Sequence, residues 1–106
     1  MAKYLIKASY TPNGVKGVLK EGGTSRKETV EKLIAGMGGK LEAFYFAFGD
    51  HDVYAISDLP DAATAAAIGM TINSSGLVTS STTVLLTPED IDKAAKKPVN
   101  YRAPGA

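Results

Sequence analysis

The chain has 106 residues, 44% of them hydrophobic and 22% charged, and a formal net charge of +1. This length fits one domain, and the composition excludes a disordered or collagen-like chain. No apolar run approaches the roughly 18 residues that a membrane-spanning helix needs, so we expect a cytoplasmic protein without a membrane partner. The sequence contains no Cys and a single His, which removes the usual metal motifs. We therefore expect no metal and no cofactor.

The first forty residues predict a strand followed by helix. Residues 3–10 alternate in polarity with period two, which is typical of a strand. Thr11 and Pro12 begin a short helical turn that ends at residues 22–23. Ser25 and Glu28 have the spacing of a capping box, and apolar residues at helical spacing then predict a helix closed by residues 38–39.

The remaining residues predict a hairpin, a second helix, a strand and a third helix. Residues 41–48 and 53–57 are expected strands joined by the polar turn 49–52. A helix should begin at residues 58–61 and end at 73–76, and residues 77–86 are rich in Val and Thr, as strands are. Thr87 caps a short helix that Pro98 stops. We expect residues 98–106 to form an extended tail that only Tyr101 anchors.

This order predicts an α+β, ferredoxin-like β-α-β-β-α-β domain over residues 1–97, with an added C-terminal helix. The strand 41–48 is apolar on both sides, whereas the helices of this plan cover only one face of the sheet. We therefore expect the other face to pack on a second copy, as a homodimer or larger homo-oligomer. A small apolar ligand is the expected guest of a pocket between the two sheets. The candidate pocket or interface residues are Phe44, Phe46, Phe48, Tyr54 and Tyr4.

Several segments also resemble the GYD-domain family of small bacterial and archaeal proteins. They are residues 3–6, 10–11, 48–53, 58–61, 73–76 and 85–89. Gly49 and Asp52 match the family's naming motif, and His51 stands where that motif usually has Tyr. The resemblance implies a dimeric α/β-barrel, ferredoxin-like fold and oligomerisation. It implies no particular biochemical activity.

Two local patterns bear on chemistry. His51 lies between two Asp residues, an arrangement that suits a general base, although a Gly- and Asp-rich turn is also what a hairpin requires. Residues 24–27, Thr24, Ser25, Arg26 and Lys27, combine hydroxyls and cations near a helix start, which suits an anion, although a flexible linker with a capping box explains them as well.

Three classes of function follow from these patterns. The favoured class is a binding or assembly module whose main partner is a second copy of the chain. The alternative is a cofactor-independent oxygenase or isomerase of the dimeric α/β-barrel type, which rests on analogy of fold. RNA-recognition domains share the same element order. However, residues 41–90 carry seven acids and no Lys or Arg, so we expect no nucleic-acid partner.

Overall fold

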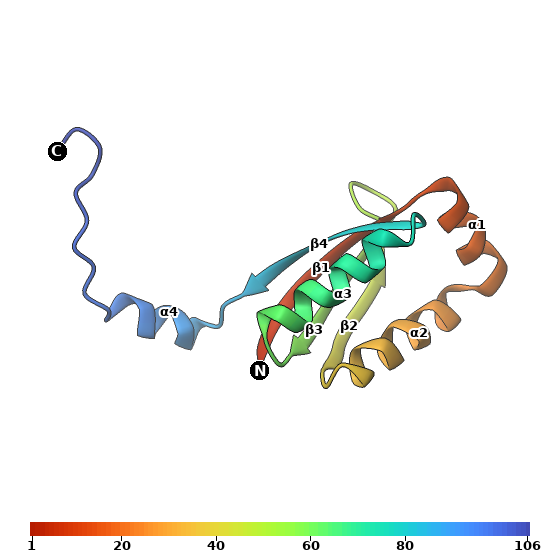
Figure 1. Ribbon diagram of the computed structural model, residues 1–106, viewed down its shortest axis with the longest axis horizontal. Coiled ribbons are helices and arrows are strands. Elements are labelled where there is room, and N and C mark those ends of the chain that lie inside the picture. The colour runs from red at the N-terminus through yellow and green to blue at the C-terminus, as the bar shows by residue number, and fades with distance from the viewer.

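The computed structural model describes residues 1–106 as a four-stranded antiparallel sheet and four helices. The strands are β1 (Ala2–Tyr10), β2 (Lys40–Phe46), β3 (Val53–Leu59) and β4 (Val78–Leu85). The helices are α1 (Pro12–Glu21), α2 (Gly23–Gly36), α3 (Ala62–Ser74) and α4 (Pro88–Ala95). The strand order is β2-β3-β1-β4, and α2 and α3 lie on the same face of the sheet (Figure 1). This α+β arrangement is compatible with the predicted ferredoxin-like plan.

Most of the predicted helix starts are confirmed by their capping hydrogen bonds. The Thr11 hydroxyl accepts from the N–H of Gly14 at 3.3 Å, and the Asp61 carboxylate accepts from the N–H of Thr64 at 2.8 Å. Thr87 and Asp90 form a complete capping box at the start of α4. Such caps satisfy N–H groups that have no partner inside the helix. None of the four helices has the length and hydropathy that crossing a bilayer requires.

The capping box predicted at Ser25 is wrong. Helix α2 begins at Gly23, so Ser25 lies inside it and its carbonyl accepts from the Thr29 hydroxyl at 3.0 Å. The cap position is Gly22, whose φ of 85° lies in the left-handed region that favours glycine. Because the chain bends at this one residue, α1 runs directly into α2 and no room is left for a separate side-chain cap.

The sheet divides the aromatic residues between its two faces. Phe44 and Phe46 face the helices and pack on the buried cluster of Ala8, Val53 and Val78. The Phe46 ring packs closely against Gly23 of α2. A Cβ added at Gly23 would lie only 3.1 Å from this ring. Phe48 lies beyond the end of β2, although the sequence predicted it inside the strand.

The core between the sheet and the helices is thin. Only 11 of 106 residues are buried. The larger cluster joins Tyr4 on β1, Ile34 on α2, Leu59 on β3, and Ala65 and Ile68 on α3. A thin core leaves a large share of apolar surface in contact with solvent. A single copy of the chain therefore buries few of the apolar side chains that it carries.

The chain after β4 leaves the rest of the molecule. Residues 86–106, here called the C-terminal arm, comprise α4 and the extended tail and project to one side (Figure 1). The radius of gyration is 16.9 Å, whereas a compact domain of about 100 residues has one of about 13 Å. Tyr101 is 73% exposed, so the expected anchoring of the tail through this residue is wrong.

Candidate functional site

One face of the sheet carries no helix, and we call it the open sheet face. The strand register places Ala43, Ile56, Leu5 and Thr83 in one row across all four strands. Tyr45, Tyr54, Lys7 and Ser81 form the next row. The centre of this face on β2, β3 and β1 is therefore apolar and aromatic, with Lys3, Lys7 and Asp58 beside it, whereas the half on β4 carries hydroxyl groups. Tyr45 is 71% exposed there.

An ion-pair cluster borders the apolar part of the open sheet face. The Lys3 ammonium lies 2.8 Å from the Glu42 carboxylate and 3.0 Å from that of Asp58. A register shift between Leu41 and Ala43 makes Glu42 the extra residue of β2. The hydrogen bonds to Glu42 and Asp58 raise the pKa of Lys3 above its usual value. These charged side chains lie at the edge of the apolar patch. Protein interfaces commonly have such a polar rim around an apolar core.

The structure separates the five residues that the sequence grouped as one pocket or interface. Tyr54 lies on the open sheet face, but Phe44, Phe46 and Tyr4 lie on the face that the helices cover. Phe48 sits in the loop after β2 and stacks on Phe46 at a centroid distance of 5.9 Å. This corrects the grouping: side chains that alternate along strands of one sheet point to opposite faces. Only Tyr54 of the five lies on the face that remains uncovered.

His51 lies in the loop between β2 and β3, next to the open sheet face. Its ring is perpendicular to that of Tyr54, with the centroids 5.8 Å apart. It also lines a shallow hollow of about 180 Å³ together with Lys7, Ser9 and Thr79. No hydrogen bond joins the His51 ring to either neighbouring Asp. The orienting carboxylate that a general base would use is therefore not in place.

Asp52 has a structural role in the same loop. Its carboxylate accepts from the N–H of Tyr10 at 2.8 Å, and its own N–H donates to the carbonyl of Ala8 at 2.8 Å. These bonds extend the pairing of β1 with β3 beyond the end of the ladder. Gly49 donates to the His51 carbonyl at 3.1 Å and closes the turn. The residues at the positions of the family motif, Gly49, His51 and Asp52, thus organise a loop rather than a cluster of facing side chains.

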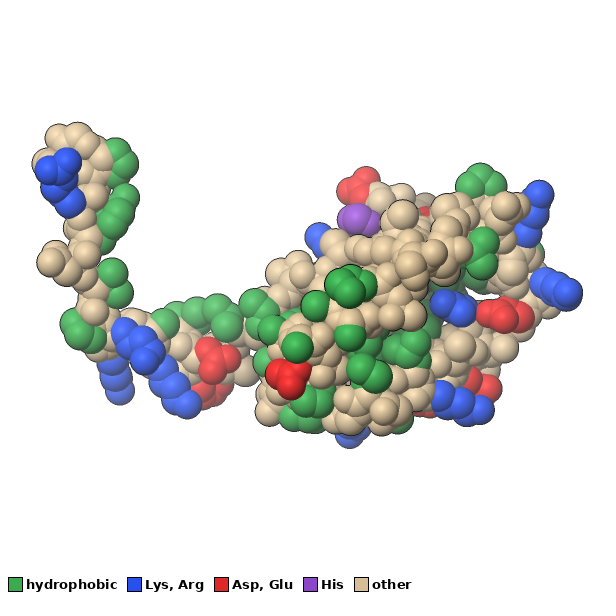
Figure 2. Space-filling model, viewed as in Figure 1, with side chains coloured by type: hydrophobic (Ala, Val, Ile, Leu, Met, Phe, Trp, Pro, Cys, Tyr) green, Lys and Arg blue, Asp and Glu red, His purple; other side chains and the backbone are tan.

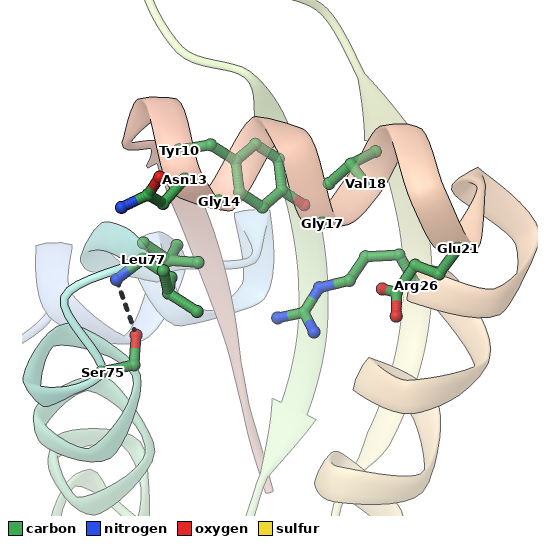
Figure 3. Close-up of a pocket in the computed structure, with 10 residues that line it drawn as sticks. Tyr10, Asn13, Gly14, Gly17, Val18, Glu21, Arg26, Ser75 and Leu77 are labelled. Atoms are coloured by element: carbon green, nitrogen blue, oxygen red, sulfur yellow. Dashed lines mark hydrogen bonds between the residues drawn. The ribbon is translucent and has the colours of Figure 1, made fainter.

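A pocket of about 240 Å³ lies where α1, α2 and the loop after α3 meet the end of β1. We call it the Arg26 pocket; its lining includes Tyr10, Asn13, Gly14, Gly17, Arg26 and Leu77. In Figure 3 the Arg26 side chain reaches from α2 into the space below Tyr10 and Val18, and its guanidinium points away from Glu21. Burial raises the pKa of the Tyr10 hydroxyl, and the charge of nearby Arg26 partly offsets that rise.

An apolar slot continues the Arg26 pocket between α2, α3 and the sheet. The two cavities share Tyr10, Arg26 and Val78. Twelve of the 15 residues that line the slot are hydrophobic, among them Phe44 and Ile72. Figure 2 shows hydrophobic side chains in the gap between α3 and α2. One cation therefore stands at the mouth of an otherwise apolar recess.

The four residues predicted as an anion site do not act together. Thr24, Ser25 and Lys27 are exposed on α2, whereas Arg26 is half-buried in its pocket. Four successive residues of a helix span more than one turn and point in different directions. The residues that surround Arg26 come from α1, the end of β1 and the segment between α3 and β4, and the local sequence around Arg26 does not connect them with it. One signal in the sequence could have indicated part of this pocket. The alternation along β1 places Tyr10 on the same face as Tyr4, which is the face that the helices cover.

Comparison with known proteins identifies the class. The model of the GYD domain family matches residues 4–95, nearly the whole chain. The protein therefore belongs to the GYD domain family, which confirms the resemblance seen in the sequence. The match includes α4 and ends at the last residue of that helix. No curated protein and no solved structure matches the chain.

Proposed function

We propose that the protein is a homo-oligomeric assembly and binding module whose subunits join through the open sheet face. The observation that carries this proposal is the row of Ala43, Ile56 and Leu5, flanked by Tyr45 and Tyr54, on a sheet face without a covering helix. An antiparallel sheet that faces water is normally polar on that side. A contiguous apolar patch with a polar rim is typical of an interface.

The C-terminal arm supports the same proposal. Its apolar side chains contact solvent: Val99 is 81% exposed and Ile91 is 52% exposed. An isolated helix of eight residues is marginal in water, because helix stability normally comes from packing an apolar face. A neighbouring copy of the chain gives α4 the surface that its own body does not provide. Because the family match extends through α4, this helix is part of the domain rather than an appendage.

Charge also favours contact between copies. The end of the arm, residues 91–106, carries a net charge of +3, whereas residues 41–85 of the body carry −5. In Figure 2 the Lys and Arg side chains of the C-terminal arm gather on the projecting segment, away from the rest of the molecule. Opposite charges on residues 91–106 of one copy and on residues 41–85 of another steer the two into one orientation.

Replacing Ile56 with Glu tests the proposed interface. Ile56 lies at the centre of the apolar row, so burying a carboxylate there in an oligomer costs several kcal/mol, whereas the separate subunit leaves it in water. We expect I56E to have the mass of one chain, 11.1 kDa, by light scattering at a concentration where the wild type is larger.

The matched control is Leu19→Glu. Leu19 is 79% exposed on α1, on the helix side of the molecule. The control also replaces a branched aliphatic side chain with a carboxylate. We expect L19E to keep the wild-type mass. Circular dichroism of both variants shows whether the fold is retained. A folded I56E with the wild-type mass would contradict the use of the open sheet face.

A further inference from the structure

The Arg26 pocket contains a charge that the chain itself does not neutralise. Arg26 is partly buried, and no carboxylate oxygen lies within 4 Å of its guanidinium, since the ion pairs of the structure are those of Lys3. Glu21 also lines the pocket but forms no ion pair with Arg26. An arginine that lines a pocket without an ion-pair partner has its N–H groups free to bind the carboxylate of a ligand.

We propose that the Arg26 pocket and the adjoining slot bind a small carboxylic acid with an apolar body. The carboxylate would face the Arg26 guanidinium at the pocket mouth, and the hydrocarbon or ring would enter the slot between α2 and α3. This binding site lies on the helix side of the sheet, so it does not depend on the proposed assembly.

The chemistry of the lining selects this class of ligand. The guanidinium is a planar fork whose two N–H groups match a carboxylate. Tyr10 and Asn13 add neutral polar groups at the pocket, and the lining contains no second cation. A phosphate or a nucleotide usually requires several donors or a cluster of cations, whereas one Arg suits a single negative charge. Glu21 further disfavours a ligand of higher charge.

The dimensions limit the ligand to one ring or a short chain. The pocket has about 240 Å³ and the slot about 70 Å³ of space, whereas pockets for drug-sized ligands have about 300–1,000 Å³. The apolar lining of the slot, with Phe44 and Ile72, favours an aromatic or branched aliphatic body over a sugar. Benzoate is therefore a suitable probe.

Titration of the ¹⁵N-labelled full-length chain with sodium benzoate tests this proposal by NMR. We expect saturable shifts of the Gly14, Gly17 and Leu77 amides, which line the pocket. Arg26→Gln should weaken binding by about tenfold or more, which is the loss expected for a charge-assisted, bidentate contact. Lys27→Gln removes a neighbouring exposed cation from the same helix and should leave the benzoate affinity unchanged.

A second variant fills the pocket instead of removing its charge. A Cβ at Gly17 would meet no atom within 4 Å, so Gly17→Leu should fold, extend a side chain into the pocket and abolish benzoate binding. Benzyl alcohol, which has the same ring without the charge, should bind much more weakly than benzoate. The proposal is overturned if benzoate causes no saturable shifts at the pocket, if R26Q binds it as tightly as the wild type, or if benzyl alcohol binds equally well.

Discussion

At the level of single residues, two glycines constrain the fold because neighbouring atoms pack directly against their backbone, where a side chain would not fit. Gly14 is buried on α1 under the carbonyl of Leu77, which accepts hydrogen bonds from the N–H of Thr11 at 3.0 Å and from its hydroxyl at 3.3 Å. Gly39 lies in a similar position, where a Cβ would come within 2.9 Å of the Leu59 side chain. These glycines bring helix ends against the sheet, and the Arg26 pocket depends on the first of them.

Gly14 and Gly17 form a matched pair for a stability test. Gly14→Ala places a methyl group against the backbone carbonyl of Leu77, and such overpacking costs about 1–3 kcal/mol. Gly17→Ala meets open space on the same helix and should stabilise the protein by up to about 1 kcal/mol through helix propensity. Urea denaturation of both variants measures these free energies. Equal effects of the two substitutions would show that the contact between α1 and Leu77 is absent.

At the scale of secondary-structure elements, the termini of the helices depend on single capping groups. Hydrogen bonds from the side chain and backbone of Thr64 lower the pKa of Asp61, and those from Thr87 lower the pKa of Asp90. A lowered pKa in the folded state means that the ionised carboxylate stabilises the fold. This contribution is complete above the unfolded value of 3.8 and is lost as pH falls through the lowered folded value.

Asp61→Asn tests this linkage. An Asn side chain still accepts from the N–H of Thr64, but it does not titrate. We expect the melting temperature of the wild type to fall more steeply than that of D61N as pH decreases below 3.8. Exposed Asp50, which forms no cap, provides the control D50N. If D61N and the wild type had parallel pH profiles, the ionised cap would contribute nothing to stability.

The element order could be predicted from the sequence because it depends on local periodicity and caps. The period-two pattern of residues 3–10 and the Thr-Pro starts of α1 and α4 are local signals, and the structure confirms them. The prediction of a capping box at Ser25 was wrong because Gly22, with its positive φ, lets α1 and α2 meet without a loop between them. The prediction that Phe48 lies in a strand was wrong because its φ of 56° is not that of an extended backbone.

The candidate sites were harder to predict because they depend on which face of the sheet the helices cover. Residue alternation groups Phe44 with Phe46 and Tyr45 with Ala43, but it does not say which group lies under α2. The apolar pocket predicted between the sheets of two copies stays a prediction; the slot found within one chain lies between the helices and the sheet. Arg26 was named as an anion ligand, but its partners Tyr10 and Asn13 are brought to it by the packing of α1.

At the scale of the whole molecule, the chain has two unpartnered parts, the open sheet face and the C-terminal arm. The principal extents of 56 × 33 × 22 Å reflect the projecting arm (Figure 1). Leu86 is 63% exposed where the arm begins, so apolar surface continues from the sheet edge onto the arm. Under the proposed function, both parts contact a second copy.

Deleting residues 88–106 separates the contribution of the arm from that of the sheet. No residue of α4 is buried, so the shortened chain should keep its folded body and its circular dichroism apart from one short helix. Because the oligomer would lose the arm's contacts, we expect it to dissociate at higher protein concentration than the full chain. Sedimentation velocity over a dilution series measures this difference. An unchanged dissociation constant would show that the arm does not contact the other subunit.

The mass of the full-length protein in solution shows whether the open sheet face joins two or more subunits. Light scattering coupled to size exclusion, at micromolar concentration and in physiological salt, should give at least 22.2 kDa, twice the 11.1 kDa of one chain. The open sheet face would then be buried between subunits, as proposed. A mass of 11.1 kDa that persists as the concentration is raised would contradict the proposed assembly, because the apolar row on the sheet would then face water in the native protein.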